Sequence, residues 1–249
     1  SAIDITYAPV KNYKKNAEII VAVDKKRVNG IQQLLKLPHP PEVILLDDAF
    51  QHRSVKPGLS ILLTTFDDLY IDDFMLPAGN LREFKSGYKR ADIVIVTKSP
   101  QNISNETQLT IKNRLKLLAH QQLYYSGTSY NEILKGGKHE LLIKNLKKYE
   151  VLLITGIANP KQLLSFLEKM EINFKHYQFG DHHRFSDQDI KKIEGEFNQI
   201  TAENKIILTT EKDYVRIFDN LENCYFISIE TIILNNETDI IQKIKNYVG

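Results

Sequence analysis

The sequence predicts an α/β protein whose parallel sheets are covered by helices on both faces. Short apolar runs rich in β-branched residues alternate with stretches of helical periodicity along most of the 249 residues. Strand–helix–strand order of this kind builds parallel sheets. Hydrophobic residues make up 42% and charged residues 26% of the chain, a balance typical of a folded protein with one or two domains.

Charge and cysteine content narrow the class of protein. Lys and Arg exceed Asp and Glu by only two, 33 against 31, so no overall basic field favours nucleic acid as a partner. The one cysteine, Cys224, cannot form an internal disulfide, which indicates a reducing compartment. No apolar run approaches the ~18 residues that span a bilayer, and the start of the chain lacks a signal-peptide pattern.

The first domain is expected to cover residues 1–125. Residues 19–23 should form a strand, and residues 29–35 a short helix that the following prolines stop. Residues 43–46 are apolar on both alternating faces, so they are predicted to form a buried strand. The other elements expected here are strands at 60–64, 93–96 and 123–126 and a helix at 105–120.

A second domain, residues 126–249, is expected to repeat this alternation. Its predicted strands are 151–155, 174–179, 206–210 and 225–229, and its predicted helices are 160–170, 187–200 and 238–248. Ser186 is the expected N-cap of the middle helix, because its hydroxyl can accept a free backbone N–H. Ligands of parallel sheets bind beyond the carboxyl ends of the strands, so polar residues there are the candidates for a site.

An acidic pair, Asp47 and Asp48, directly follows the run at 43–46. Two carboxylates at the end of a rigid strand form a Walker-B arrangement, which supplies the oxygen ligands that Mg²⁺ prefers. Gln51 and His52 in the next turn strengthen the case for a site. The alternative is that the two aspartates simply open a turn.

A loop at 76–83, LPAGNLRE, carries the next candidates. Arg82 could hold a phosphate through two hydrogen bonds, and Glu83 could add a carboxylate beside a metal. Alternatively, both belong to exposed ion pairs. Three more cations follow and suit either an anionic ligand or headgroup, or simple solvation: Lys85, Lys89 and Arg90.

The third candidate segment holds Asp181, His182 and His183. An aspartate beside a histidine orients the imidazole and raises its basicity, as a proton acceptor requires. Adjacent histidines point in different directions from an extended chain, so one functional histidine is expected rather than a joint metal site. The alternative is a turn that begins a helix and holds its histidines incidentally.

Two other junctions carry weaker signals. The backbone N–H groups at residues 156–160 could receive an anion, and Lys212 in the 209–213 segment could contact phosphate. Ordinary structural turns are the commoner explanation of both. Neither the G-x-x-x-x-G-K-[ST] pattern nor the G-x-G-x-x-G pattern occurs in the sequence.

Taken in order, these segments resemble the tetraacyldisaccharide 4'-kinase family of the lipid A pathway in Gram-negative bacteria. The strings LDDAFQH at 46–52 and LPAGNLRE at 76–83 are its most specific motifs, and the style of the sequence is similar to Bacteroidetes members. Matching stretches run from about residue 17 to residue 249: 23–30, 43–52, 76–83, 89–98, 154–158, 180–185 and 209–213.

The resemblance implies a P-loop NTPase-like core followed by a smaller α/β domain. It also implies transfer of the ATP γ-phosphate, with Mg²⁺, to the 4'-hydroxyl of a tetraacyldisaccharide 1-phosphate, the lipid A precursor. The enzyme would work at the cytoplasmic face of the inner membrane as a peripheral protein. No nucleic acid is expected to take part.

The resemblance also implies roles for individual residues. Asp47, Asp48 and Glu83 would form the metal shell. Arg82, Gln51 and His52 would contact substrate or phosphate. His182, supported by Asp181, would assist the base that takes the substrate hydroxyl proton, with Asp48 as a further catalytic group.

Family members carry a P-loop and a GDEP element before the position of Ala17, and residues 1–16 contain neither. The N-terminal part of the core is therefore expected to be missing, and the chain by itself is expected to phosphorylate its substrate poorly. Two other functions stay open at this point. One is a non-catalytic α/β binding module, and the other is a metal-dependent phosphoesterase that uses Asp47, Asp48 and His182.

Overall fold

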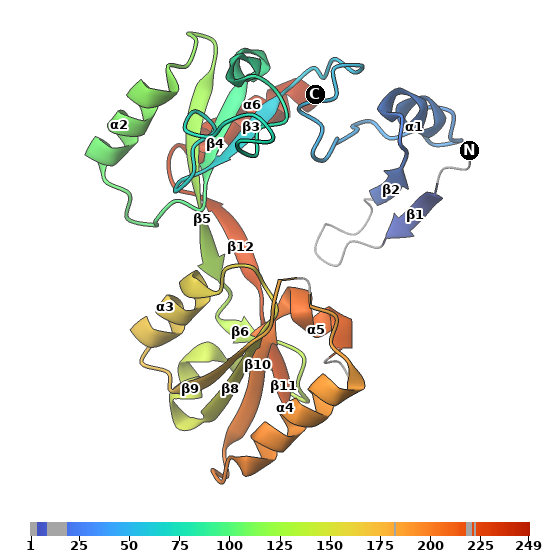
Figure 1. Ribbon diagram of the computed structural model, residues 1–249. Helices are drawn as coiled ribbons and strands as arrows, with labels where there is room; N and C mark the ends of the chain where they lie inside the picture. Colours follow the sequence, from blue (N-terminus) through green and yellow to red (C-terminus); the bar gives the residue numbers. More distant parts are fainter. Residues whose placement is uncertain (1–3, 9–18, 182, 218–220, 222) are drawn as a thin grey trace. The chain divides into compact units, whose positions relative to one another are not determined.

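The computed structural model describes residues 4–8, 19–181, 183–217, 221 and 223–249, and it divides the chain into two compact units (Figure 1). Unit 1 holds residues 1–127 and 233–249, and unit 2 holds residues 128–232. The α/β class with parallel sheets is confirmed. The chain enters unit 2 within strand β5 (Gln122–Tyr130) and leaves it within strand β12 (Ile229–Ile233).

Unit 1 contains a four-stranded sheet in the order β12-β5-β4-β3. Strands β3 (Ile61–Thr65), β4 (Ile93–Thr97) and β5 run parallel, and helix α2 (Asn105–Leu115) connects the last two. Alternate residues of β4 face opposite sides of the sheet. On one side, Val94 and Val96 pack in a cluster with residues of α2, whereas Ile93 on the other side packs in a cluster with Ile240.

The C-terminal helix α6 (Glu237–Val248) belongs to unit 1. The sequence-based boundary at residue 125 lies close to the observed one, but the expectation that all later residues join the second domain differs from the structure. Tyr124 of β5 donates a hydrogen bond to Asp239 of α6, and the Tyr125 N–H donates to Asn235. These contacts and the burial of Ile240 hold the helix against the first sheet.

The N-terminal part of unit 1 contains strand β2 (Ile19–Val23) and helix α1 (Arg27–Leu34), as predicted. Strand β1 (Asp4–Ala8), which the sequence did not predict, pairs with β2 in antiparallel fashion. The prediction of a buried strand at 43–46 is wrong. This segment has no regular structure, and Val43 and Leu45 are 51% and 91% exposed. An apolar run becomes a central strand only where neighbouring strands take its hydrogen bonds, and the described residues offer it none.

Unit 2 is a four-stranded parallel sheet in the order β11-β10-β8-β9. Its main core lies on the side of helix α3 (Lys161–Lys169), and a second cluster lies on the side of helix α4 (Asp187–Gln199). Its strands are β8 (Glu150–Thr155), β9 (Phe174–Gln178), β10 (Lys205–Thr210) and β11 (Cys224–Ile227).

The remaining elements of the chain are short. They are strands β6 (Ile133–Leu134) and β7 (Leu141–Leu142), the 3₁₀ helices η1 (Lys85–Arg90) and η2 (Ile143–Lys148), and helix α5 (Glu211–Ile217). The predicted N-cap of α4 is confirmed, because Ser186 and Asp189 form a capping box at its start. No helix within the described part of the chain has the length and apolar character to cross a membrane.

The strand order of unit 2 creates a position where ligands commonly bind in parallel sheets. Strand β8 lies between β9 and β10, so the connections that follow β8 and β10 lead to opposite sides of the sheet (Figure 1). The carboxyl ends of these two strands form a topological switch point, the usual place for a site in an open α/β sheet. Gly156 follows β8, and the 209–213 segment spans the end of β10, so both weaker sequence signals lie here.

Candidate active site

Asp47 and Asp48 lie in a turn, and both side chains are exposed. Asp48 has a φ of 44°, in the left-handed region that aspartate tolerates better than most residues. The turn interpretation is therefore correct for the backbone, and both carboxylates still face solvent. In the ranges that the structure describes, no three His, Cys, Asp or Glu side chains gather closely enough to hold a metal ion by themselves.

The acidic turn is joined to the 76–83 loop by an ion pair. The Arg82 Nη1 atom donates to Asp48 Oδ2 at 3.2 Å. The two side chains are 63% and 69% exposed, so solvent screens the pair, and it contributes about 0–1 kcal/mol to stability. The contact brings the two motifs together, and breaking it so that Arg82 can bind another partner costs little free energy.

A stronger contact joins the same two segments. Arg90 Nη2 lies 2.7 and 2.9 Å from the two carboxylate oxygens of Glu83 and 3.0 Å from the main-chain oxygen of Phe50. The guanidinium also lies 4.8 Å from the centre of the Phe50 ring. A β-carbon at Gly87 would lie 2.6 Å from the Glu83 carboxylate, so only glycine allows this approach. Glu83 thus faces Arg90, and its role as a metal ligand stays a prediction.

The LPAGN turn owes its shape to Asp73, which the sequence did not single out. The Asp73 carboxylate accepts the backbone N–H groups of Phe74 and Asn80. A β-carbon at Gly79 would lie 2.2 Å from this carboxylate. Main-chain hydrogen bonds between residues 74–76 and Leu81 close the loop. The loop is therefore a fixed scaffold that presents Arg82 and Glu83.

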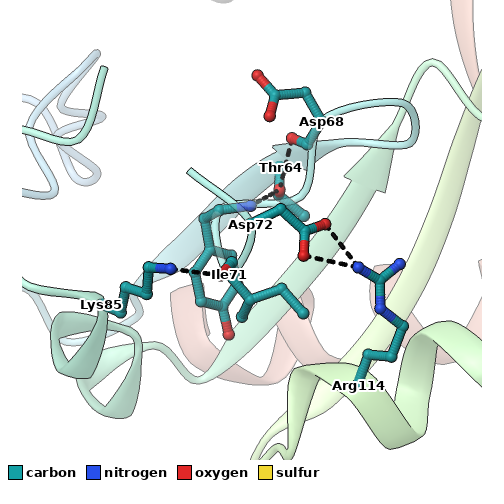
Figure 2. Close-up of polar contacts among 7 residues, drawn as sticks. Thr64, Asp68, Ile71, Asp72, Lys85 and Arg114 are labelled. Carbon is teal, nitrogen blue, oxygen red and sulfur yellow. Dashed lines mark hydrogen bonds and ion pairs between the residues drawn. The ribbon is translucent and has the colours of Figure 1, made fainter. Parts of the chain in front are cut away.

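Lys85 is engaged in the fold. Figure 2 shows its Nζ atom directed at the main-chain oxygen of Ile71, at 2.5 Å, and the ammonium also lies 5.2 Å from the centre of the Phe74 ring. In the same region, Arg114 of α2 donates to both oxygens of Asp72, at 2.6 and 2.7 Å. These contacts favour a structural role for Lys85 over a role in headgroup binding.

Gln51 and His52 follow the acidic pair in the next turn, and both side chains are exposed. The His52 N–H donates to the Ala49 carbonyl oxygen at 2.9 Å, which closes this second turn. Two successive turns therefore expose four polar side chains of one motif to solvent. Their predicted contacts with substrate stay a prediction.

The described residues of the Asp181–His183 segment contact partners that the sequence did not indicate. Asp181 pairs with Lys212 at 3.5 Å. His183 Nε2 lies 3.0 Å from Asp189 Oδ2, and its ring packs against Phe179 in a tilted arrangement with a centroid distance of 4.7 Å. His183 is thus built into the start of α4. His182, the predicted catalytic histidine, lies outside the described residues.

The pKa of Asp189 is lowered to about 2 from the usual 3.8. The main cause is the backbone N–H of Ser186, followed by the hydrogen bonds from His183 and from the Ser186 hydroxyl. All of them favour the charged carboxylate. The capping carboxylate therefore stays ionised across the neutral range and holds His183 in place.

The carboxyl ends of β8 and β10 are tied together by Asp213, which is fully buried. Asp213 Oδ2 accepts the Gly156 N–H at 2.9 Å and the Thr210 hydroxyl at 2.8 Å. The Gly156 N–H, considered above as an anion-binding group, is thus already bonded to a carboxylate of the chain itself. Sequence analysis missed this residue, although an aspartate three residues after a strand was a usable signal.

A family model described as Tetraacyldisaccharide-1-P 4'-kinase matches residues 11–248. The chain belongs to this family. A tetraacyldisaccharide 4'-kinase of Flavobacterium johnsoniae is 43% identical over 242 residues, which cover 96% of this chain and 69% of the relative. The kinase of Bacteroides thetaiotaomicron is 42% identical over 249 residues, covering 93% of this chain and 66% of the relative.

A solved member of the kinase family shares the fold. The crystal structure of LpxK from Aquifex aeolicus, described as an "apo" form in complex with ATP, matches with a TM-score of 0.66 and 26% identity. The match covers 92% of this chain and 65% of that one, so the chain spans about two thirds of the length of these relatives. The resemblance deduced from the motifs is confirmed. Membership identifies a lipid A pathway kinase, and the binding-module and phosphoesterase alternatives are not favoured.

Proposed function

We propose that the chain takes part in transfer of the ATP γ-phosphate to the 4'-hydroxyl of a tetraacyldisaccharide 1-phosphate. The reaction would take place at the cytoplasmic face of the inner membrane of a Gram-negative bacterium, with the protein bound peripherally, because the substrate is a lipid. The observation that carries the proposal is the joining of the LDDAFQH and LPAGNLRE segments through Asp48, Arg82, Glu83 and Arg90. The names of the relatives support the same reaction.

The geometry of the acidic turn suits the charge problem of phosphoryl transfer. Such a reaction needs neutralised phosphate oxygens and a positioned hydroxyl more than covalent help. Arg82 can release Asp48 at little cost, because the pair is exposed, and can then hold a phosphate. Gln51 and His52 lie in the next turn and can add polar contacts to substrate.

The residues present fit Mg²⁺. This ion usually keeps several waters and takes one or two carboxylates together with substrate phosphates. Asp47 and Asp48 offer two exposed carboxylates side by side. When bound there, Mg²⁺ would supply charge neutralisation. Glu83, which Arg90 holds in place, would stand at the outer edge of this shell.

His182 is the proposed helper of the general base, and Asp181 would support its charge. A histidine suits this task because its ordinary pKa lies close to neutrality. His183 is less suited to this role, because Asp189 and aromatic side chains hold its ring in place. This supports His182 as the functional histidine of the pair.

The experiment measures lipid phosphorylation. Because the relatives are longer, the region of the Flavobacterium johnsoniae kinase that precedes the match is joined to this chain, and transfer from labelled ATP is followed with Mg²⁺ present. We expect transfer by this chimera and a loss of orders of magnitude in kcat for Asp48→Ala. Asp67→Ala, which removes another exposed aspartate of unit 1, is the control. A folded chimera that transfers no phosphate, or an Asp48→Ala variant with normal turnover, would contradict the proposal.

A further inference from the structure

The segment at 209–213, which the proposed function does not use, is linked to the 180–185 element directly through Lys212 and indirectly through Asp213. Lys212 pairs directly with Asp181 at 3.5 Å. Asp213 acts from inside the fold, where it is fully buried. Its Oδ2 atom accepts two hydrogen bonds, one from the backbone after β8 and one from Thr210 at the end of its own strand. A charged acceptor holds such donors more firmly than a neutral one.

Gly156 lies close to both Asp213 and the aromatic ring of Phe185. A β-carbon at Gly156 would lie 3.1 Å from Asp213 Oδ1, 3.4 Å from Phe185 Cζ and 3.5 Å from Phe185 Cε2. The carboxylate and the Phe185 ring therefore both border the side-chain position of Gly156, where little room remains for a larger residue. A displacement of Asp213, which holds the Gly156 N–H, should be felt by Phe185, because packed interiors transmit displacement.

Phe185 in turn packs against the histidine of the element. Its ring centre lies 5.1 Å from that of His183, edge to face, and 4.9 Å from that of Phe179. His183 is fixed on its other side by Asp189. A continuous set of contacts thus runs from Asp213 through Gly156 and Phe185 to His183.

We propose that Asp213 is a positioning residue that acts through Gly156 and Phe185 on the placement of His183, within the 180–185 element that is proposed to handle the proton. The inference rests on the proposed function for its catalytic consequence, but the positioning itself is independent of activity. Asp213 touches no reacting atom in this proposal and acts only through Gly156 and Phe185.

Nuclear magnetic resonance on the chain tests the positioning directly. Asp213→Asn should speed exchange of the Gly156 amide hydrogen by about tenfold, because a neutral acceptor replaces a charged one. The aromatic resonances of Phe185 and His183 should shift in the same variant. Unchanged exchange and unchanged resonances in a folded variant would overturn the inference, whatever the kinase activity.

A pair of glycine variants decides the matter if Asp213→Asn does not fold. Gly156→Ala inserts a methyl group between Asp213 and Phe185, so the His183 and Phe185 resonances should shift. Gly180→Ala adds the same group within the 180–185 element itself, but nothing lies within 4 Å of its β-carbon, and the resonances should stay. Equal responses of the two variants would overturn the inference.

The kinase chimera tests the catalytic consequence. Asp213→Asn should lower kcat by about tenfold or more and leave the KM for ATP within about twofold, because the element is proposed to handle the proton and not the nucleotide. Moved resonances with an unchanged kcat would overturn the link to catalysis. An inactive wild-type chimera would reject the proposed function instead, and the resonances alone would then decide the positioning.

Discussion

Arg90 donates to both carboxylate oxygens of Glu83, and the same nitrogen contacts the main-chain oxygen of Phe50. One guanidinium thus joins Phe50 and Glu83, which belong to different motifs and lie more than thirty residues apart in the sequence. Arg90 and Glu83 are only 35% and 24% exposed, so this cluster is less screened than the Asp48–Arg82 pair. The planar guanidinium of Arg90, which lies over the Phe50 ring, has a geometry that a lysine side chain does not share.

Arg90→Ala should therefore lower the free energy of unfolding by about 1–2 kcal/mol, because it removes charge-assisted hydrogen bonds and leaves Glu83 without this partner. Urea denaturation of the chain measures the effect. Lys89→Ala, which removes the neighbouring exposed cation, should change the free energy by less than about 0.5 kcal/mol. Equal losses in the two variants would show that the cluster contributes nothing specific.

Arg82→Ala should behave in the opposite way. Its pair with Asp48 is more than 60% exposed on both sides, so the free energy of unfolding should change by less than about 1 kcal/mol. Binding of Mg²⁺-ATP or lipid phosphate by the kinase chimera should weaken, because a phosphate-binding cation is lost. Calorimetric titration and urea denaturation together check both halves. A large loss of stability with normal binding would make Arg82 a structural residue.

The sequence predicted the strands of unit 2 well, because each strand there finds its neighbours within the chain. Strand β8 is flanked by β9 and β10, and its apolar residues are buried on both faces. The run at 43–46 has the same apolar character, but no described strand pairs with it, and Leu45 stays exposed. Local pattern therefore identified a strand former, whereas pairing decided whether a strand exists.

The candidate site shows the same limit at the level of side chains. The sequence did not indicate that Asp181 pairs with Lys212, 31 residues away. The expected contact between Asp181 and His182 involves a residue outside the described part of the chain, so it stays a prediction. Asp189, six residues from His183, takes the ring nitrogen of that histidine. Such partners depend on how the strands are ordered in the sheet, and one sequence does not contain that order. Residue types and motifs were predictable, and their partners were not.

Tyr124→Phe tests the attachment of the C-terminal helix to unit 1. The Tyr124 side chain is 1% exposed, and its hydroxyl donates to Asp239 of α6 and contacts Gln122. Loss of this hydroxyl should lower the free energy of unfolding by about 1–2 kcal/mol, because the acceptor is a carboxylate. Tyr247→Phe on the exposed part of the same helix is the control. Identical denaturation curves for Tyr124→Phe and the wild type would contradict the assignment of this contact.

The start of α4 should lose stability in acid because of Asp189. Its pKa is about 2 in the folded chain against the ordinary 3.8, so folding favours the charged form. The stabilisation is complete above about pH 4, where the unfolded carboxyl is also ionised, and it disappears as the pH falls through about 2. Asp189→Asn should therefore be less stable than the wild type at pH 6, and the difference should shrink toward pH 2. Urea denaturation across this range measures it, with Asp187→Asn in the same helical turn as the control. A difference that does not change with pH would show that the capping carboxylate does not contribute through its charge.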